Sequence, residues 1–183
     1  MADGERASGT LVEGLRQELT RGALPGETAG FSATEQEEAA AFLAAVAGRR
    51  QRGEMVIRLE SRGGADATNR RMRLAIVNDD MPFLVDSVAN AIAGRGLATH
   101  RLLHPVVCVT RNGTGELQAV EELCDAVERR ESMMYIELDR ADARTRQELV
   151  QELHQVLGDV RLAVEDWQAM TARMRADADA VSD

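Results

Sequence analysis

The densest group of residues that could do chemistry is an acidic run, Asn78-Asp79-Asp80-Met81-Pro82, which is followed by Asp86. Carboxylate and amide oxygens of this kind bind Mg²⁺ or Ca²⁺, but three carboxylates without further oxygen ligands are a weak metal signal. A carboxylate that precedes a helix can instead cap its first N–H groups, and we expect Asp80 to do so. Because backbone N–H groups at a helix start also bind anionic ligands, this turn is the candidate ligand site. Its residues are Asp80, Met81, Pro82 and Phe83.

The histidines are not spaced to bind a metal. His100 and His104 lie four residues apart in a segment with strand character, which separates them by about 13 Å. His154 has no other ligand type clustered around it. We therefore expect no metal site.

Nucleophilic and lysine-based catalysis also lack support. All 22 basic residues are arginine, so Schiff-base chemistry and a phosphate-binding Walker lysine are excluded. Cys108 lies in an apolar run and Cys124 in an acidic one. Two cysteines make no disulfide framework in a chain of this size, and we interpret them as reduced thiols. No dinucleotide-binding fingerprint is present, so we expect neither a catalytic site nor a bound cofactor.

Composition limits the partners. The 183 residues are 44% hydrophobic and 29% charged, which is typical of a globular chain. A net charge of −9 and only 3% aromatic residues argue against nucleic acid and anionic membranes as partners. No apolar run is long enough to span a bilayer, and the N-terminus lacks the apolar segment of a secretory signal. We expect a cytoplasmic protein.

Residues 1–53 are predicted to form a helical N-terminal extension. Thr10 with Glu13, and Ser32 with Glu35, have the spacing of capping boxes that start helices. An apolar stripe follows the second box and includes Phe42, Leu43 and Val46.

Residues 54–158 are predicted to form one α+β domain. Alternating apolar and polar residues predict strands over 55–60, 71–77 and 133–139, and an extended segment over 97–109 that Pro105 interrupts. A turn at 112–115 predicts a hairpin with a return strand over 116–120, whereas residues 121–130 have no clear type. Helical spacing follows Pro82 and recurs from Leu149 to a predicted end at Gly158. This order predicts a split β-α-β fold, an antiparallel sheet with both helices on one face.

A further helix and an acidic tail are predicted over 159–183. Val160, Val164, Trp167 and Met170 share one helix face, so we interpret Trp167 as a packing residue.

The second face of the sheet is predicted to be partly apolar, around Ala75, Val77, Met133 and Tyr135. A face of this kind needs cover. We expect a weak homodimer, formed by pairing of sheet faces or edges. In a strict monomer, Phe42, Leu43 and Val46 would cover the face instead.

The run Ile76-Val77-Asn78-Asp79-Asp80-Met81-Pro82-Phe83-Leu84-Val85-Asp86-Ser87-Val88 resembles the N-terminal region of the very large bacterial NAD-specific glutamate dehydrogenases. Shorter stretches agree with that family and are Arg95-Gly96-Leu97, His104-Pro105-Val106, Glu131-Ser132, Ile136-Glu137-Leu138-Asp139-Arg140 and Val164-Glu165-Asp166-Trp167. The resemblance covers about residues 54–174 and implies an ACT-like domain of the ferredoxin-like class.

The resemblance also implies a function. The parent enzyme would oxidatively deaminate L-glutamate to 2-oxoglutarate and ammonia with NAD, using a catalytic domain outside this chain. This chain would then be a non-catalytic regulatory or assembly domain whose partners are the remaining domains. ACT domains commonly bind amino acids at a turn with the pattern Asp-x-Pro-Gly-x-Leu. Asp80 and Pro82 match it, but Phe83 replaces the glycine and is expected to keep free amino acids out. The alternative function is an amino-acid sensor that uses this turn.

Overall fold

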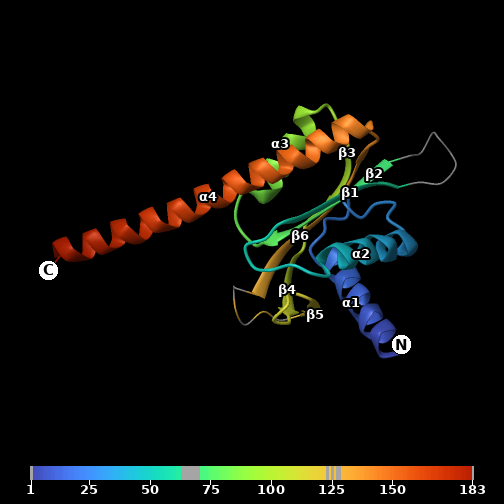
Figure 1. The fold of residues 1–183 in the computed structure, drawn as a ribbon, viewed down its shortest axis with the longest axis horizontal. Helices are drawn as coiled ribbons and strands as arrows, with labels where there is room; N and C mark the ends of the chain where they lie inside the picture. Colours follow the sequence, from blue (N-terminus) through green and yellow to red (C-terminus); the bar gives the residue numbers. More distant parts are fainter. Residues whose placement is uncertain (1, 63–70, 123, 125, 127–128, 183) are drawn as a thin grey trace.

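The computed structural model describes residues 2–62, 71–122, 124, 126 and 129–182. Its elements in chain order are α1 (Ala2–Arg21), α2 (Ala33–Ala47), β1 (Val56–Arg62), β2 (Arg71–Asp79), α3 (Leu84–Gly94), β3 (Thr99–Leu103), β4 (Val106–Arg111), β5 (Leu117–Glu121), β6 (Arg130–Asp139) and α4 (Ala143–Ser182). Figure 1 shows the strands as one sheet between two pairs of helices, with the end of α4 extending far from the sheet. The predicted α+β class and the N-terminal helices are confirmed.

The sheet is antiparallel and has β2 and β6 at its centre. The strand order is β1-β2-β6-β4-β5, and β3 also pairs with β6. Strands β3 and β4 thus both pair with β6, and they do so at different points along its length. The break between them falls at Pro105, as predicted, and its carbonyl oxygen accepts a hydrogen bond from Met133 N at 3.0 Å. The predicted hairpin joins β4 to β5.

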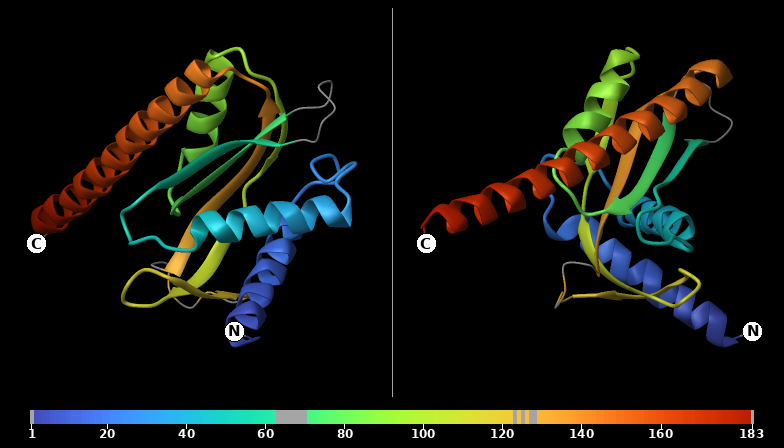
Figure 2. Two further views of the ribbon diagram at one scale, coloured as in Figure 1. Left: turned by 45° about the vertical axis from the view of Figure 1, so that its right-hand side comes forward. Right: turned by 60° about the vertical axis from the view of Figure 1, so that its left-hand side comes forward.

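Helices α3 and α4 cover one face of the sheet (Figure 2). The side chains that form this layer alternate along the strands and recur at helical spacing, as the sequence predicts. They are Met72, Leu74, Ile76, Met134, Ile136 and Leu138 from the sheet, and Leu84, Val88, Ile92, Leu149, Leu153 and Leu157 from the helices.

Helices α1 and α2 cover the opposite face. Phe42, Leu43 and Val46 pack in one cluster with Tyr135 and its apolar neighbours on the sheet. This is the arrangement predicted for a monomer. The chain itself therefore covers the face that was expected to pair, and the expected weak homodimer stays a prediction.

One of the two capping boxes starts a helix. Ser32 Oγ accepts from Glu35 N at 3.3 Å, and the Glu35 carboxylate accepts from Ser32 N at 2.9 Å. Thr10 does not start a helix, because α1 already begins at Ala2. Extending a helix costs less free energy than nucleating one, so α1 continues through the Thr10–Glu13 box without a break.

Helix α4 is a single helix of 40 residues. The predicted end at Gly158 is wrong, because glycine costs a helix only about 1 kcal/mol and Leu153 and Leu157 anchor the turns before it. Trp167 is 61% exposed, so its predicted packing role is also wrong.

The two cysteines are joined by a disulfide, so their interpretation as reduced thiols is wrong. Cys108 is buried in β4, and Cys124 lies in the connection from β5 to β6. Their two Cα atoms lie 5.4 Å apart. Residues 123, 125, 127 and 128 of the segment without a predicted type lie outside the described residues.

Candidate functional site

The candidate ligand turn connects β2 to α3. The helix begins at Leu84, after a turn that contains Pro82 and Phe83, and no side chain caps it. The prediction that Asp80 caps this helix is wrong, because the intervening turn separates its carboxylate from the first N–H groups. Asp80 instead forms an ion pair with Arg130 at 2.9 Å.

Phe83 has the backbone conformation that the family pattern reserves for glycine. Its φ of 70° and ψ of 2° are left-handed, and it is the one non-glycine residue with positive φ in the described part of the chain. This conformation costs a residue with a Cβ about 1–2 kcal/mol. The side chain is 65% exposed, so little packing compensates for the strain. The turn therefore keeps the backbone shape that suits glycine while it carries a phenyl group.

Buried polar side chains lie at the end of β2, next to this turn. Asn78 and Ser132 are partners in the β2–β6 register and are each 1% exposed. Asn78 Oδ1 accepts from Asp79 N at 2.9 Å and from Arg161, whereas Asn78 Nδ2 has no hydrogen-bond partner. A buried donor without a partner carries a desolvation cost that a bound acceptor would relieve.

His104 contacts the same group. Its Nε2 lies 2.7 Å from Ser132 Oγ. Burial lowers the pKa of His104 below its ordinary value, and the nearby Asp80 carboxylate only partly opposes this shift. The imidazole is consequently neutral near pH 7 and can exchange a hydrogen bond with the Ser132 hydroxyl.

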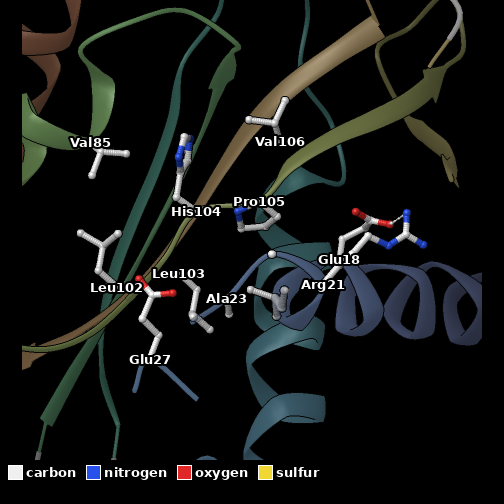
Figure 3. A pocket seen from close by; sticks show the side chains of 12 residues that line it. Glu18, Arg21, Ala23, Glu27, Val85, Leu102, Leu103, His104, Pro105 and Val106 are labelled. Atoms are coloured by element: carbon white, nitrogen blue, oxygen red, sulfur yellow. Dashed lines mark ion pairs between the residues drawn. The ribbon is translucent and has the colours of Figure 1, made fainter. Parts of the chain in front are cut away.

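A pocket of about 440 Å³ lies on the other side of His104 (Figure 3). Its walls come from the end of α1, the segment after it, the corner between β3 and β4, and Val85 in the first turn of α3. Glu18 and Arg21 form an ion pair at 3.0 Å along one wall. None of the four predicted ligand-site residues lines this pocket. Sequence reasoning missed it because its walls come from separate segments that only the fold brings together.

A buried network of ion pairs surrounds Asp79 at the end of β2 and Glu131 at the start of β6. Arg50 is 2% exposed and pairs with both Asp79 and Glu131, the latter at 2.5 Å. Arg111 donates two hydrogen bonds to the Glu131 carboxylate, each of 2.8 Å. Arg161 forms an ion pair with Asp79 at 2.8 Å. The network thus joins the segment after α2, the ends of β2 and β4, the start of β6, and α4.

The charge on Asp79 is fixed by this network. Burial by itself would raise the pKa of Asp79, but hydrogen bonds from Arg161, Arg50 and the Gly53 N–H outweigh burial and lower it. Asp79 therefore stays ionised and serves as a structural anchor.

The remaining histidine of the β3 segment pairs with a carboxylate. His100 Nε2 lies 2.7 Å from Asp139 Oδ1, and this contact lowers the pKa of Asp139. Within the described ranges, no three His, Cys, Asp or Glu side chains are grouped so that they could hold a metal ion. No helix in the described part of the chain is both long and apolar enough to cross a membrane.

Comparisons with known proteins point to one family. The family described as glutamate dehydrogenase, ACT1 domain, matches residues 16–153. The NAD-specific glutamate dehydrogenase of Halomonas elongata is 41% identical over 106 residues, which cover 56% of this chain and 7% of that protein. The NAD-specific glutamate dehydrogenase of Pseudomonas aeruginosa is 37% identical over 105 residues, 55% of this chain and 6% of that protein. The chain therefore spans less than a tenth of the length of these relatives. No solved structure matches it.

Proposed function

Because the chain belongs to the glutamate dehydrogenase ACT1 domain family, we propose that it is a regulatory and assembly domain of an NAD-dependent glutamate dehydrogenase. The family match over residues 16–153 carries this proposal, since it takes in the whole sheet, α2, α3 and the adjoining ends of α1 and α4. The parent enzyme would oxidatively deaminate L-glutamate to 2-oxoglutarate and ammonia in the cytoplasm.

The domain itself is proposed to be non-catalytic. The chain contains no lysine, so it cannot itself carry out lysine-based catalysis. It matches only 7% of the Halomonas elongata dehydrogenase, which leaves the rest of such a protein to bind NAD and glutamate. The partners of this domain would be those remaining domains.

A pair of assays tests the proposal. The purified chain, supplied with L-glutamate and NAD, should produce no NADH, and measurable NADH would overturn the non-catalytic part. Removal of residues 54–158 from the dehydrogenase that carries them should change its assembly or its response to effectors while the active site still turns over. A shortened enzyme that assembles and responds normally would overturn the regulatory part.

The second candidate function is an amino-acid sensor at the turn Asp80–Phe83. Two observations favour it, namely the uncapped start of α3 and the buried Asn78 Nδ2 without a partner. Carboxylates bind well at helix starts, but the Phe83 side chain stands where close approach to the backbone is needed. Calorimetry with a panel of amino acids should show no binding to the natural chain. Binding that appears only in Phe83→Gly would support the steric explanation, and tight binding by the natural chain would establish the sensor.

A further inference from the structure

The disulfide between Cys108 and Cys124 lies where β4 changes its pairing partner. In the strand register, Cys108 is opposite Arg130 of β6 on one side and opposite Glu121 of β5 on the other. The β5–β6 connection, residues 122–129, therefore joins two strand ends that lie on opposite sides of β4. Cys124 belongs to this connection, so the disulfide ties it to the strand between its two ends.

Cys108 is buried, but it is not part of the apolar core. Its neighbours Val107 and Val109 pack in the cluster beneath α1 and α2. Side chains alternate along a strand, so Cys108 points to the opposite face of the sheet. Among the described residues, the apolar cluster on that face does not include it, and Figure 1 shows β4 and β5 at the end of the sheet away from α3. Both layers of the core thus pack without the disulfide, and we expect them to stay folded when it opens.

The two cysteines differ in access to solvent. Cys124 is exposed, whereas Cys108 is 6% exposed. Thiol–disulfide exchange begins when a thiolate attacks one of the two sulfur atoms, and its rate depends on which sulfur the thiolate can reach. Cys124 Sγ is therefore the sulfur that a thiol from solvent attacks, and Cys108 is the leaving group.

Polar contacts of Arg129 also hold the β5–β6 connection. Arg129 donates hydrogen bonds to the Val109 carbonyl oxygen at 3.3 Å and to Thr110 Oγ1 at 2.6 Å, and it forms an ion pair with Glu121. The side chains of this ion pair are 31% and 35% exposed, and ion pairs that are open to solvent contribute little stability. The covalent link is thus a stronger restraint on the connection than these polar contacts.

The connection leads directly into residues that organise the neighbouring turn. Arg130 forms an ion pair with Asp80 at 2.9 Å, and Glu131 pairs with Arg50 at 2.5 Å. Opening the bond to Cys108 removes a restraint immediately before Arg130 and Glu131. The disulfide is thus placed where its state can alter the order of the chain beside the candidate ligand turn.

We propose that Cys108 and Cys124 form a redox modification site, at which thiols of the glutathione class open and re-form the disulfide. In the opening reaction, one thiolate attacks Cys124 Sγ, the bond to Cys108 Sγ breaks, and Cys108 leaves as a thiolate that takes up a proton. A second thiolate then attacks the sulfur of the first thiol in this mixed disulfide and releases Cys124 as a thiol. Two thiols become one disulfide, and the protein gains two electrons and two protons.

The compartment favours a reversible disulfide over a permanent one. Structural disulfides are rare in a reducing cytoplasm, where the disulfides that do occur are usually transient and catalytic or redox-sensing. This step rests on the cytoplasmic location proposed above. The redox behaviour is measured on the purified chain, so a negative result would leave the proposed role as a domain of a dehydrogenase untouched.

Glutathione buffers test the proposal in the full 183-residue chain. Over the ratios of reduced to oxidised glutathione found in a reducing cytoplasm, the chain should pass from mostly disulfide to mostly dithiol, as measured by the mass that alkylation adds. Its far-ultraviolet circular dichroism should stay unchanged, and re-oxidation should restore the disulfide. A chain that stays oxidised at every ratio, that forms no disulfide, or that unfolds on reduction would overturn the proposal.

Two single variants test which sulfur is attacked. With oxidised glutathione, Cys124 in the Cys108→Ser variant should form a mixed disulfide several times faster than Cys108 does in the Cys124→Ser variant. The reason is the difference in exposure between the two cysteines. Equal rates would contradict the assignment of Cys124 Sγ as the attacked sulfur.

Limited digestion with trypsin tests whether the disulfide restrains the connection. Trypsin cleaves after arginine, so cleavage after Arg129 should be several times faster in the reduced chain and in Cys124→Ser than in the oxidised chain. Cleavage after Arg144 is the matched control, because that side chain is 88% exposed on α4, and its rate should be the same in both redox states. Equal rates after Arg129 in the oxidised and reduced chains would overturn the proposed effect on the connection.

Discussion

Arg50 and Glu131 form an ion pair at 2.5 Å although they are 81 residues apart and almost fully buried. Arg50 lies in the segment after α2, and Glu131 is the second residue of β6. Buried charges are costly unless every partner is in place, so this contact makes the N-terminal helices part of the folded domain. The boundary predicted near residue 53 therefore marks a change of sequence pattern. Residues on both sides of it share the same buried ion pairs.

Loss of the Arg50 guanidinium should be strongly destabilising. Arg50→Ala leaves Asp79 and Glu131 with fewer counter-charges in a buried position, which costs about 3–5 kcal/mol. Urea unfolding followed by circular dichroism measures the change. The matched control is Arg16→Ala, which removes an exposed Arg16–Glu13 pair and should have a much smaller effect, because solvent screens that pair. Equal effects of the two variants would contradict a structural role for the buried network.

Phe83→Gly should stabilise the protein. The change removes a left-handed strain of about 1–2 kcal/mol and adds about 0.5–1 kcal/mol of unfolded-state entropy, which leaves a net gain of up to about 1.5 kcal/mol. Phe83→Ala keeps the Cβ and hence the strain, so it should give no such gain. Thermal unfolding of the three proteins decides the matter, and a destabilised Phe83→Gly would show that the phenyl group contributes packing that outweighs its strain.

Local patterns predicted what local physics controls. The alternation of Met72, Leu74 and Ile76 placed one face of β2 correctly, because side chains in a strand alternate between faces. The Ser32–Glu35 box succeeded because both halves of its contact lie within one turn. Thr10 and Gly158 failed because tertiary packing and helix continuation outweigh single capping residues, which contribute only about 1 kcal/mol.

Contacts between distant segments were not predictable. Arg50 lies in an arginine-rich stretch that looks like a solvated linker, and nothing local marks its partners 29 and 81 residues away. Cys108 and Cys124 gave no framework signal because a single pair has no spacing pattern to match. At the candidate site, the sequence identified the turn but not its geometry, because the position of the helix start depends on the φ of Phe83.

Reduction of the disulfide should destabilise the protein. Cys108 and Cys124 are 16 residues apart, and closing a loop of that size restricts the unfolded chain by about 3 kcal/mol. Urea midpoints with and without dithiothreitol measure the difference, and a thiol assay on the native protein should find no free cysteine. Cys124→Ser should have the stability of the reduced protein and should not respond to dithiothreitol. A natural chain that is equally stable in both conditions would contradict this prediction.

Stability should fall as the pH drops below the ordinary pKa of histidine, because of His104. Burial lowers the pKa of the folded imidazole below 6.5, so the unfolded chain takes up a proton at a higher pH than the folded chain does. The stability linked to the neutral imidazole is therefore complete above about pH 6.5 and is lost as the pH falls through the folded pKa. Asp80 weakens this effect without reversing its sign, since its carboxylate favours the charged imidazole only in part.

His104→Gln separates this contribution from the rest of the titration curve. Glutamine can still hydrogen-bond to Ser132 Oγ but does not titrate, so the free energy of unfolding should depend less on pH between 7 and 5 than in the natural chain. The comparison variant is His154→Gln, which makes the same substitution at a histidine exposed on α4. Chemical unfolding at a series of pH values gives the three slopes. A slope for His104→Gln equal to that of the natural chain would mean that His104 takes up its proton as readily in the folded state as in the unfolded one, and that its contact with Ser132 does not require the neutral ring.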